Sequence, residues 1–246
     1  MSTVAIMQPY LFPYLGYFQL IHAVDKFIVF DDVAYIKKGW INRNRILVDG
    51  KPHYFTVPLA GASQNRRICD IALADQPWRP RMLKTFEHAY RRAPNYRQIL
   101  PLIERVLARG QGTIADLALA SLKEICEFLG VATAFVPTTR SYGNHALKAQ
   151  ARILDICARE QATTYVNAAG GRDLYASDDF AAQGIELKFL RTAEYEYDQG
   201  RHPFQPHLSI LDVLMFAGRD RTVEFLDRYE LLPGRPRSTD VEAAPT

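Results

Sequence analysis

The pattern of residues 4–23, a strand followed by a stiff loop and a helix, constrains the fold more than any other stretch of the chain. Residues 4–7 are apolar and typical of a short buried strand, and residues 15–23 have the apolar spacing of a helix. Pro9 and Pro13 stiffen the loop between them, because each fixes φ and restricts the preceding residue. In α/β proteins, a strand that leads through such a loop to a helix N-terminus forms a site for an anion or a nucleotide.

The same loop provides the first candidate binding residues. Tyrosines recur along it, and the hydroxyl group of a tyrosine needs a hydrogen-bond partner when its ring is buried. Gly16 permits either close approach of the backbone to a ligand or tight packing of the helix. The alternative interpretation is an ordinary turn with a tyrosine-rich core. The candidate substrate-binding residues here are Gln8, Tyr10, Tyr14, Gly16 and Tyr17.

Strand and helix patterns alternate in the outer thirds of the chain, whereas the middle third is a hairpin followed by helices. Further strands are predicted from apolar stretches at residues 26–30, 134–138, 163–167 and 185–190. A hairpin is closed by Asp49-Gly50, with strands at residues 45–48 and 51–59 and an edge strand at residues 68–73. Helical spacing occurs at residues 78–91, 95–108, 113–129, 145–159, 177–184, 208–217 and 219–229.

These patterns predict an α/β fold with a mostly parallel, doubly wound, Rossmann-like sheet, a β-hairpin and a helical insertion at about residues 78–130. Thr113 with Asp116 is a start signal for the third helix of the insertion, and Gly130 is a stop signal. We expect residues 1–232 to form a single domain and residues 233–246 to be a disordered tail.

Composition excludes several classes of protein. The chain has 246 residues and a net charge of +3 with interspersed acids and bases, which is too weak a balance to indicate nucleic-acid binding. No stretch reaches the roughly 18 apolar residues of a membrane span, and the N-terminus lacks the basic region of a signal peptide. The cysteines lack metal-ligand spacing, so we predict no metal site, and buried free thiols at Cys126 and Cys157 indicate a cytoplasmic protein.

Polar clusters follow four of the predicted strands, at residues 8–17, 31–45, 138–145 and 167–175. In doubly wound sheets, ligands bind at the carboxyl ends of the strands. Asp31 and Asp32 end a strand at this rim, where they can hold Mg²⁺, bind a substrate amine or act as a general base. The alternative is that these carboxylates cap a turn.

A basic and aromatic segment after the second strand is the best candidate for a phosphate clamp. Arginine grips phosphate or carboxylate with a two-pronged fork. In an extended segment Arg43 and Arg45 share one face and Asn42 and Asn44 the other, so a ligand contacts only one pair. The alternative is a solvated basic loop. The candidate residues of this segment are Lys38, Trp40, Asn42, Arg43, Asn44 and Arg45.

Candidate residues also occur later in the chain. Ser141 follows a strand and contacts substrate or caps a helix, and we favour Asn144 as the cap. A glycine-rich strand end supplies further candidates for substrate binding: Asn167, Gly170, Gly171 and Tyr175. Near the C-terminus, His207 is a candidate general base, and Ser209 with Asp212 is either catalytic or a capping box. No nucleophile elbow, phosphate-binding Walker loop or dinucleotide fingerprint occurs.

Several motifs, in order along roughly residues 4–218, resemble the signature of the WbqC-like family. They are Met7-Gln8-Pro9-Tyr10, Phe12-Pro13-Tyr14-Leu15-Gly16-Tyr17-Phe18, Phe30-Asp31-Asp32, Trp40-Ile41-Asn42-Arg43-Asn44-Arg45, Tyr165-Val166-Asn167, Gly170-Gly171, Leu174-Tyr175, Phe204, Pro206 and Leu208-Ser209-Ile210-Leu211-Asp212. Members of this family tend to be encoded among genes for bacterial surface polysaccharides and some small-molecule pathways. The resemblance implies chemistry on amino sugars or amino acids, such as attachment of an aminoacyl group.

The N-terminus also resembles nucleotidyltransferases and pantothenate-synthetase-like ligases, which run from a strand into a His-x-Gly-His turn that opens a helix. Here Tyr14 and Tyr17 stand in place of both histidines. Tyrosine hydroxyls donate hydrogen bonds but carry no positive charge, which argues against ATP binding by this route.

The leading hypothesis is an enzyme that forms an amide by transferring or ligating an acyl or aminoacyl group onto an amino sugar or amino acid. The small-molecule substrate is expected free or in nucleotide-linked form, and activation by ATP would bring Mg²⁺ as well. The alternatives are a nucleotidyltransferase that makes an activated sugar or acid, and a non-catalytic carbohydrate-binding protein.

Overall fold

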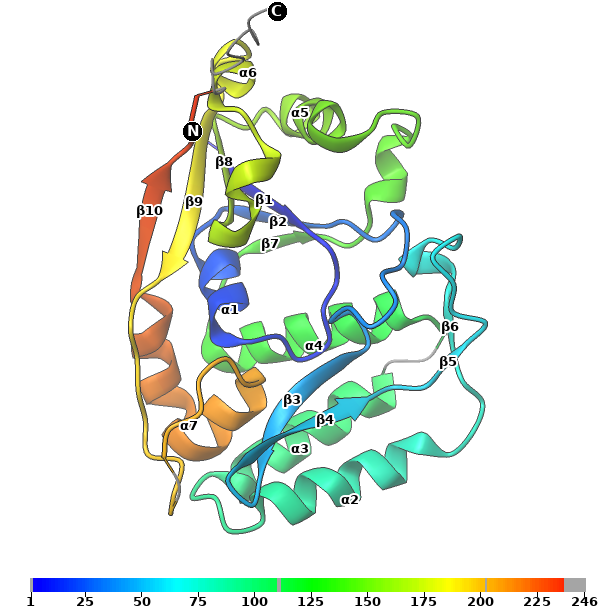
Figure 1. Ribbon diagram of the computed structural model, residues 1–246, viewed down its shortest axis with the longest axis vertical. Coiled ribbons are helices and arrows are strands. Elements are labelled where there is room, and N and C mark those ends of the chain that lie inside the picture. The colour runs from blue at the N-terminus through cyan, green and yellow to red at the C-terminus, as the bar shows by residue number, and fades with distance from the viewer. Residues whose placement is uncertain (1, 110–111, 202, 237–246) are drawn as a thin grey trace, which may run out of the picture.

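A mostly parallel sheet lies at the centre of the computed structural model, which describes residues 2–109, 112–201 and 203–236 (Figure 1). Six strands follow the order β10-β9-β8-β1-β2-β7, and all are parallel except β10, which pairs antiparallel with β9. The sheet confirms the predicted α/β class. Its strands are β1 (Thr3–Met7), β2 (Lys26–Val29), β7 (Ala134–Val136), β8 (Thr164–Ala168), β9 (Glu186–Thr192) and β10 (Tyr229–Pro233).

The strand order reverses at β1. From β1 the chain adds β2 and later β7 on one side, and then returns to add β8 and β9 on the other side. β1 is therefore hydrogen-bonded to β2 and to β8. A crevice at the carboxyl ends of two such strands is where open α/β sheets bind ligands.

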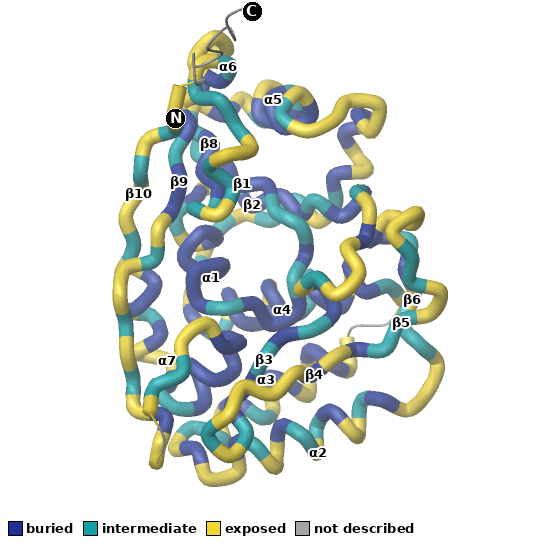
Figure 2. Tube along the Cα trace, in the orientation of Figure 1, coloured by how far each residue is buried: buried dark blue, intermediate teal, exposed yellow. Residues whose placement is uncertain are grey.

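Both faces of the sheet are covered, which is what makes β1 an almost completely buried strand (Figure 2). Ala5 packs with helices α1 (Leu15–His22), α4 (Ile114–Leu129) and α7 (Ile210–Leu226) in the larger core cluster. Val4 and Ile6 face the smaller cluster formed with α5 (Ala149–Arg159) and α6 (Ser177–Ala181). This alternation follows from the two-residue period of a strand.

The predicted hairpin and helical insertion are present. β3 (Arg43–Val48) and β4 (Lys51–Thr56) pair antiparallel, and Asp49 and Gly50 both have positive φ angles, of 48° and 77°. Helices α2 (Trp78–Tyr90), α3 (Tyr96–Arg109) and α4 follow. α4 begins with the expected capping box of Thr113 and Asp116 and ends at Gly130, whose φ is 78°.

Two segments of the middle third differ from the sequence prediction. Residues 68–73, expected as one edge strand, form a 3-10 turn (Ile68–Asp70) and the short strand β6 (Ala72–Leu73), which pairs with β5 (Leu59–Ala60). The helix expected at residues 145–159 begins only at Ala149, because residues 139–142 form a 3-10 turn and the chain stays irregular as far as Lys148.

The C-terminal region agrees with the prediction in part. Helices were expected at residues 208–217 and 219–229, and α7 is indeed interrupted between them at Gly218, whose φ of 76° and ψ of −178° are not helical. The second helical piece ends at Leu226, and strand β10 follows it. The tail expected from residue 233 onward is ordered at its start, because Pro233 pairs with Lys188 and the Gly234 N–H donates to the Leu187 carbonyl at 2.9 Å. Residues 237–246 of the predicted tail lie outside the described residues.

Two further observations concern the class of protein. Cys126 and Cys157 are buried free cysteines, as expected, and burial raises the pKa of each thiol to about 12. Among the described residues, no helix is long and apolar enough to cross a bilayer.

Candidate functional site

The loop between β1 and α1 is held from several sides. Phe12 has a φ of 44°, a conformation that bulky residues rarely adopt, and it is completely buried. Its N–H donates to the Ser121 hydroxyl at 3.2 Å, and its carbonyl accepts from the Asn44 amide at 2.6 Å and the Ser209 hydroxyl at 2.7 Å. Such strain persists only where the surroundings over-determine the backbone, and it clusters at ligand sites. The loop is therefore a rigid wall.

A cavity of about 670 Å³ opens beside this loop, at the carboxyl ends of β1 and β8. We call it the main cavity. Its volume lies within the range of small-molecule sites. Nine of the residues predicted from the sequence line it: Gln8, Tyr10, Tyr14, Tyr17, Trp40, Asn167, Gly170, Gly171 and Tyr175. Apolar residues complete the wall, among them Ile6, Phe30, Ile36 and Leu174.

A smaller cavity of about 230 Å³, the side cavity, adjoins the main cavity. Tyr10, Tyr14 and Trp40 line both cavities, and Arg45 and His207 complete the side cavity. Two polar candidate residues from distant parts of the chain thus meet the aromatic wall of the main cavity. His207 is exposed and has a left-handed φ of 59°.

Aromatic rings and arginines stack across this boundary. The ring of Trp40 lies 6.1 Å from that of Tyr10 and 5.9 Å from that of Tyr54, with interplanar angles of 31° and 25°. The guanidinium of Arg43 lies 4.9 Å from the centroid of Tyr54, and that of Arg45 lies 5.5 Å from the centroid of Trp40. These distances allow cation–π attraction, which holds both arginines on one face of β3, as expected.

The two arginines differ in which of their guanidinium donors are already hydrogen-bonded to the protein. Arg43 donates from Nε to the Gly39 carbonyl at 2.9 Å and from Nη2 to the Lys38 carbonyl, so it braces the turn before β3. Arg45 donates from Nη2 to the His207 carbonyl at 3.3 Å, and its buried Nε has no partner within the described chain. Arg45 is therefore the arginine with unused donor capacity, and Lys38 lines neither cavity.

The asparagines of this segment are structural. The Asn42 side chain accepts from the Tyr35 hydroxyl at 2.8 Å and donates to the Val57 carbonyl at 2.7 Å. Asn44 donates to the Phe12 carbonyl, as described above, and accepts from the Arg45 N–H at 2.8 Å. Both amides are buried and face away from the cavities, on the opposite side of the strand from the arginines.

Polar groups in the main cavity are of two kinds. The Tyr17 hydroxyl donates to the Gln8 carbonyl at 2.6 Å, and Asn167 donates to the Tyr165 hydroxyl at 3.1 Å. Within the described residues, the hydroxyls of Tyr10 and Tyr14 have no hydrogen-bond partner. Burial raises the pKa of both tyrosines, so their hydroxyls remain neutral donors at ordinary pH.

Asp31 and Asp32 are buried in a network that does not line either cavity. Asp32 accepts from Nη2 of Arg152 at 2.6 and 2.7 Å and from the Thr139 hydroxyl at 2.5 Å. Asp31 accepts from the Thr138 hydroxyl at 2.8 Å, and desolvation raises the pKa of its carboxyl group. The pair ties the end of β2 to the segment after β7, so both carboxylates are already satisfied by protein donors.

The residues next to Asp31 and Asp32 in space belong to the same hydrogen-bond network. Asn144 was expected to cap a helix, but it accepts from Nε of Arg152 at 2.9 Å and donates to Asp155 at 2.7 Å. The Ser141 hydroxyl donates to the Thr138 carbonyl at 3.2 Å, outside both cavities. The cluster at residues 138–145 therefore lies apart from the main cavity.

Gly16 serves helix packing, the second of its two expected uses. It is buried in α1, and a Cβ atom at this position would lie 2.6 Å from the Thr192 hydroxyl oxygen and from the Tyr14 ring. No side chain fits without displacing one of these neighbours. Gly16 thus allows α1 to pack close to the end of β9.

Ser209 and Asp212 form only half of the expected capping box. The Ser209 hydroxyl caps α7 by accepting from the Leu211 N–H at 3.3 Å. Asp212 instead turns into the core and accepts from the hydroxyls of Tyr90 and Tyr197 at 3.0 and 2.8 Å, and from the Gln199 amide at 2.8 Å. No cation pairs with Asp212 in the described chain, and burial raises its pKa to about 6.

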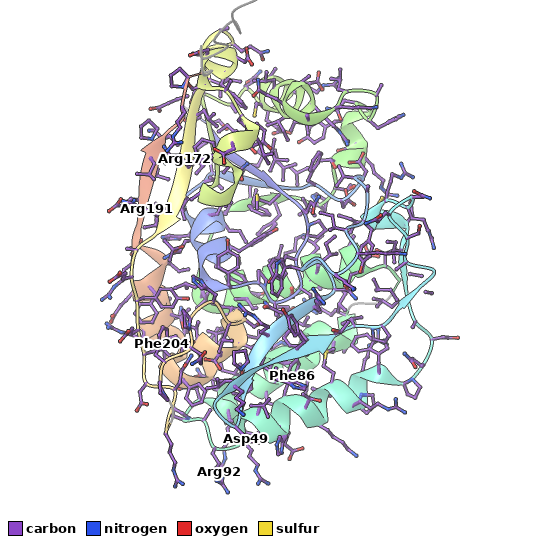
Figure 3. All side chains as sticks on the ribbon, viewed as in Figure 1. Asp49, Phe86, Arg92, Arg172, Arg191 and Phe204 are labelled. Carbon is purple, nitrogen blue, oxygen red and sulfur yellow. The ribbon has the colours of Figure 1, made fainter. Side chains whose placement is uncertain are left out.

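The segment between β9 and α7 carries His207, a candidate general base in the sequence analysis, to the site. Tyr197 and Phe204 of this segment pack edge to face, with ring centroids 5.2 Å apart. Figure 3 shows the position of Phe204. Phe204 and His207 line a third, open cavity of about 610 Å³ on the outer side. His207 thus lies where the side cavity meets this outer cavity.

Sequence reasoning also missed Arg152 and Tyr54. Arg152 occupies a buried position of the helical pattern at residues 145–159, and a buried arginine requires a carboxylate partner, which is a usable signal. Tyr54 lies on an exposed face of the hairpin, and nothing in its local sequence distinguishes it from a surface tyrosine.

Comparison with known proteins gives a match to a family and a match to a curated protein. The profile of the WbqC-like protein family matches residues 8–224. The uncharacterized protein Rv1507c of Mycobacterium tuberculosis is 29% identical over 223 residues, which cover 89% of this chain and 96% of that protein. No solved structure matches the chain significantly.

Proposed function

The chain belongs to the WbqC-like protein family, and on that premise we propose that it is an enzyme that transfers an acyl or aminoacyl group to the amine of an amino sugar or amino acid. The observation that carries the proposal is the meeting of Arg45, His207 and an aromatic wall at the junction of the main and side cavities. Aromatic faces suit a sugar ring, Arg45 suits an anionic group, and His207 suits a proton transfer.

The reaction would use an acyl group that already carries a leaving group. The neutral amine nitrogen attacks the carbonyl carbon, the C–N bond forms, and the bond to the leaving group breaks with its electron pair. An ammonium with a pKa of about 10 is protonated at neutral pH, so a base must take its proton. His207 is the candidate base, since Asp31, Asp32 and Asp212 are buried and hydrogen-bonded elsewhere.

The tyrosines of the shared wall have a complementary role in this proposal. The hydroxyls of Tyr10 and Tyr14 remain protonated because burial raises the pKa of each. Neutral hydroxyls can donate hydrogen bonds to the carbonyl oxygen, which gains negative charge as the amine attacks. Arg45 would hold a phosphate or carboxylate of the donor or the acceptor through its guanidinium, which lines the side cavity.

A binding screen followed by a product assay tests the proposal. Nucleotide-linked amino sugars, free amino acids, acyl thioesters and nucleoside triphosphates with and without Mg²⁺ are tested for a rise in melting temperature. Pairs of binding compounds are then incubated, and amide products are detected by mass spectrometry. We expect His207→Gln to lower turnover by roughly 10²-fold while binding persists, and Arg45→Gln to weaken binding roughly tenfold.

The controls are His145→Gln and Arg92→Gln, which change the same residue types at exposed positions outside the cavities. Turnover that His207→Gln leaves unchanged would contradict its role as the base. If Arg45→Gln and Arg92→Gln impair amide formation equally, Arg45 does not act as the anion site in this reaction.

A nucleotidyltransferase is the second candidate, favoured by the placement of the main cavity at the strand-order reversal beside the β1 loop. Release of pyrophosphate from a nucleoside triphosphate together with a stable nucleotide-linked product, and without any amide, would select it over amide formation. Saturable sugar binding without turnover of any pair would select the carbohydrate-binding alternative.

A further inference from the structure

The wall of the main cavity carries no charged side chain. Among the described residues that line it, there is no lysine, arginine, histidine, aspartate or glutamate. The charged candidates of the site, Arg45 and His207, line the adjoining side cavity instead. A charged group that entered the main cavity would lose hydration and gain no partner of opposite charge, which is costly. The main cavity therefore suits an uncharged occupant.

The polar side chains of the main cavity that lack a partner are concentrated at its boundary with the side cavity. Tyr17 and Asn167 donate hydrogen bonds to other protein groups, and Asn167 also accepts from the next backbone N–H at 2.7 Å. The free hydroxyls are those of Tyr10 and Tyr14, which line both cavities. The Gln8 amide is the exception within the described chain, and it is partly exposed to solvent.

Exposed apolar side chains gather at the main cavity. In the described part of the chain six large hydrophobic residues are exposed, and three of them line this cavity: Ile36 at 50%, Trp40 at 40% and Leu174 at 71%. A fourth, Tyr54, stacks on Trp40 with ring centroids 5.9 Å apart. Such a concentration of exposed apolar surface marks a binding site for an apolar group.

These side chains come from two separate segments. Ile36 and Trp40 belong to the connection between β2 and β3, and Leu174 ends the 3-10 segment Ala169–Leu174 that follows β8. The completely buried Phe12 loop holds neither segment, so the apolar side chains are not there to fill the core. Water is left in contact with them unless a ligand covers them.

We propose that the main cavity binds a hydrocarbon chain whose polar end lies at the boundary with the side cavity. Within the reaction proposed above, on which this assignment rests, the chain is the acyl group of the donor. Its carbonyl group lies near the hydroxyls of Tyr10 and Tyr14, and the amine approaches from the side cavity, where His207 lies. The donor is then a fatty acyl compound, because the ammonium group of an aminoacyl donor would have no partner in the main cavity.

A series of neutral primary amides tests this binding without any reaction. Butanamide, hexanamide and octanamide are titrated into the native chain by isothermal titration calorimetry. We expect the dissociation constant to fall by up to roughly fourfold for each added methylene, the scale of transfer of one methylene from water. The heat-capacity change of binding should become more negative with chain length.

A matched pair of ligands tests the charge. Heptanamide and 6-aminohexanamide have the same length, but the second ends in an ammonium group. We expect 6-aminohexanamide to bind at least roughly tenfold more weakly, because the main cavity offers its charge no partner.

The two indole groups of the chain locate the bound amide. Trp40 lines the main cavity and Trp78 does not. Octanamide should shift the ¹H–¹⁵N resonance of the Trp40 indole saturably and leave that of Trp78 in place. Trp40→Phe assigns the two resonances. A shift of the Trp78 resonance alone would place the chain outside the main cavity and overturn the proposal.

Two exposed leucines provide a variant and its matched control. Leu174→Gln should weaken octanamide binding roughly fivefold, because it removes an apolar contact at the cavity. Leu147→Gln changes an exposed leucine outside the cavity and should leave the affinity unchanged. The proposal is overturned if affinity is equal across the amide series, if 6-aminohexanamide binds as well as heptanamide, or if both leucine variants weaken binding equally.

The reaction is measured separately. Octanoyl and glycyl thioesters of N-acetylcysteamine are incubated with the amines of the binding screen, and products are identified by mass spectrometry. Chain-length-dependent binding with no amide product from either thioester supports the hydrocarbon site and contradicts the transfer reaction. Amide formation from the glycyl thioester alone, with no effect of chain length on binding, supports the transfer reaction and contradicts the hydrocarbon site.

Discussion

Phe12 shows how single residues support the site. Its strained backbone turns the chain from β1 toward α1, an acceptor on α4 binds its N–H, and donors from β3 and the start of α7 bind its carbonyl. Sequence reasoning assigned Asn44 and Ser209 to substrate binding, whereas the structure uses both side chains to fix this loop. An asparagine that binds a ligand and one that binds a distant carbonyl look the same in a sequence.

Removal of the Asn44 amide should destabilise the loop. Asn44→Ala leaves the buried Phe12 carbonyl with one of its two donors, and we expect the free energy of unfolding to fall by about 1–3 kcal/mol. Urea denaturation measures the loss. Asn65→Ala is the control, because Asn65 is exposed. A change of less than about 0.5 kcal/mol for Asn44→Ala, as for ordinary surface substitutions, would show that the loop does not depend on this bond.

The ion pair of Asp32 and Arg152 leads to a second prediction at this scale. Both side chains are about 95% buried, and removal of one partner leaves an uncompensated charge. Arg152→Met should therefore lower the free energy of unfolding by about 3–5 kcal/mol. Arg140→Met, at an exposed position, is the control for loss of a positive charge. Equal chemical-denaturation midpoints for the two variants would exclude the structural role assigned to the pair.

At the scale of elements, local patterns predicted most strands and helices, and the misses have a common cause. The apolar period fixed the positions of β1, β2, β8 and β9, and Asp49-Gly50 fixed the hairpin. β10 was not predicted: only Tyr229 was expected in a helix, and Pro233 was expected to begin the tail. The five residues of β10 become a strand only through pairing with β9, which is distant in sequence. Strand formation depends on such tertiary context more than helix formation does.

Asp212 links α7 to the segment that carries His207, and its titration should affect stability. Its pKa is about 6 in the folded protein and 3.8 in the unfolded reference, so the folded state binds the proton more tightly. The resulting stabilisation is complete below the unfolded pKa and is lost as pH rises through the folded pKa. At about 1.4 kcal/mol per pKa unit, this amounts to a loss of roughly 3 kcal/mol between about pH 4 and pH 6.

Urea denaturation of the native chain and of Asp212→Asn across this pH range isolates the contribution. The native chain should lose stability relative to the variant as the pH rises, because the asparagine cannot ionise. Parallel stability curves for the two proteins between pH 4 and pH 7 would mean that the Asp212 carboxyl group titrates equally in the folded and unfolded states.

At the scale of the whole molecule, the expected topology indicated which edge of the sheet carries the site. It did not indicate which of the polar clusters line the main cavity. The clusters at residues 8–17 and 167–175 meet because β1 and β8 are neighbours in the sheet. The cluster at residues 138–145 follows β7, which is an edge strand two positions from β1, so it remains distant from the main cavity. The order of strands in a sheet, which decides these distances, is not encoded in any local pattern.

The open space around Gly170 provides a test of the main cavity itself. No heavy atom lies within 4 Å of a Cβ atom built at this residue, and its backbone is outside the left-handed region. A phenylalanine there can extend into the main cavity without displacing the core. We expect Gly170→Phe to leave the melting temperature of the free protein unchanged. We expect it to weaken roughly tenfold the binding of any compound that stabilises the native chain through this cavity.

The matched control is Ala181→Phe, which adds the same ring to an exposed position of α6 outside the cavity. Melting curves with and without the stabilising compound measure both effects for each variant. If Gly170→Phe and Ala181→Phe retain the same ligand-induced rise in melting temperature, the compound binds elsewhere.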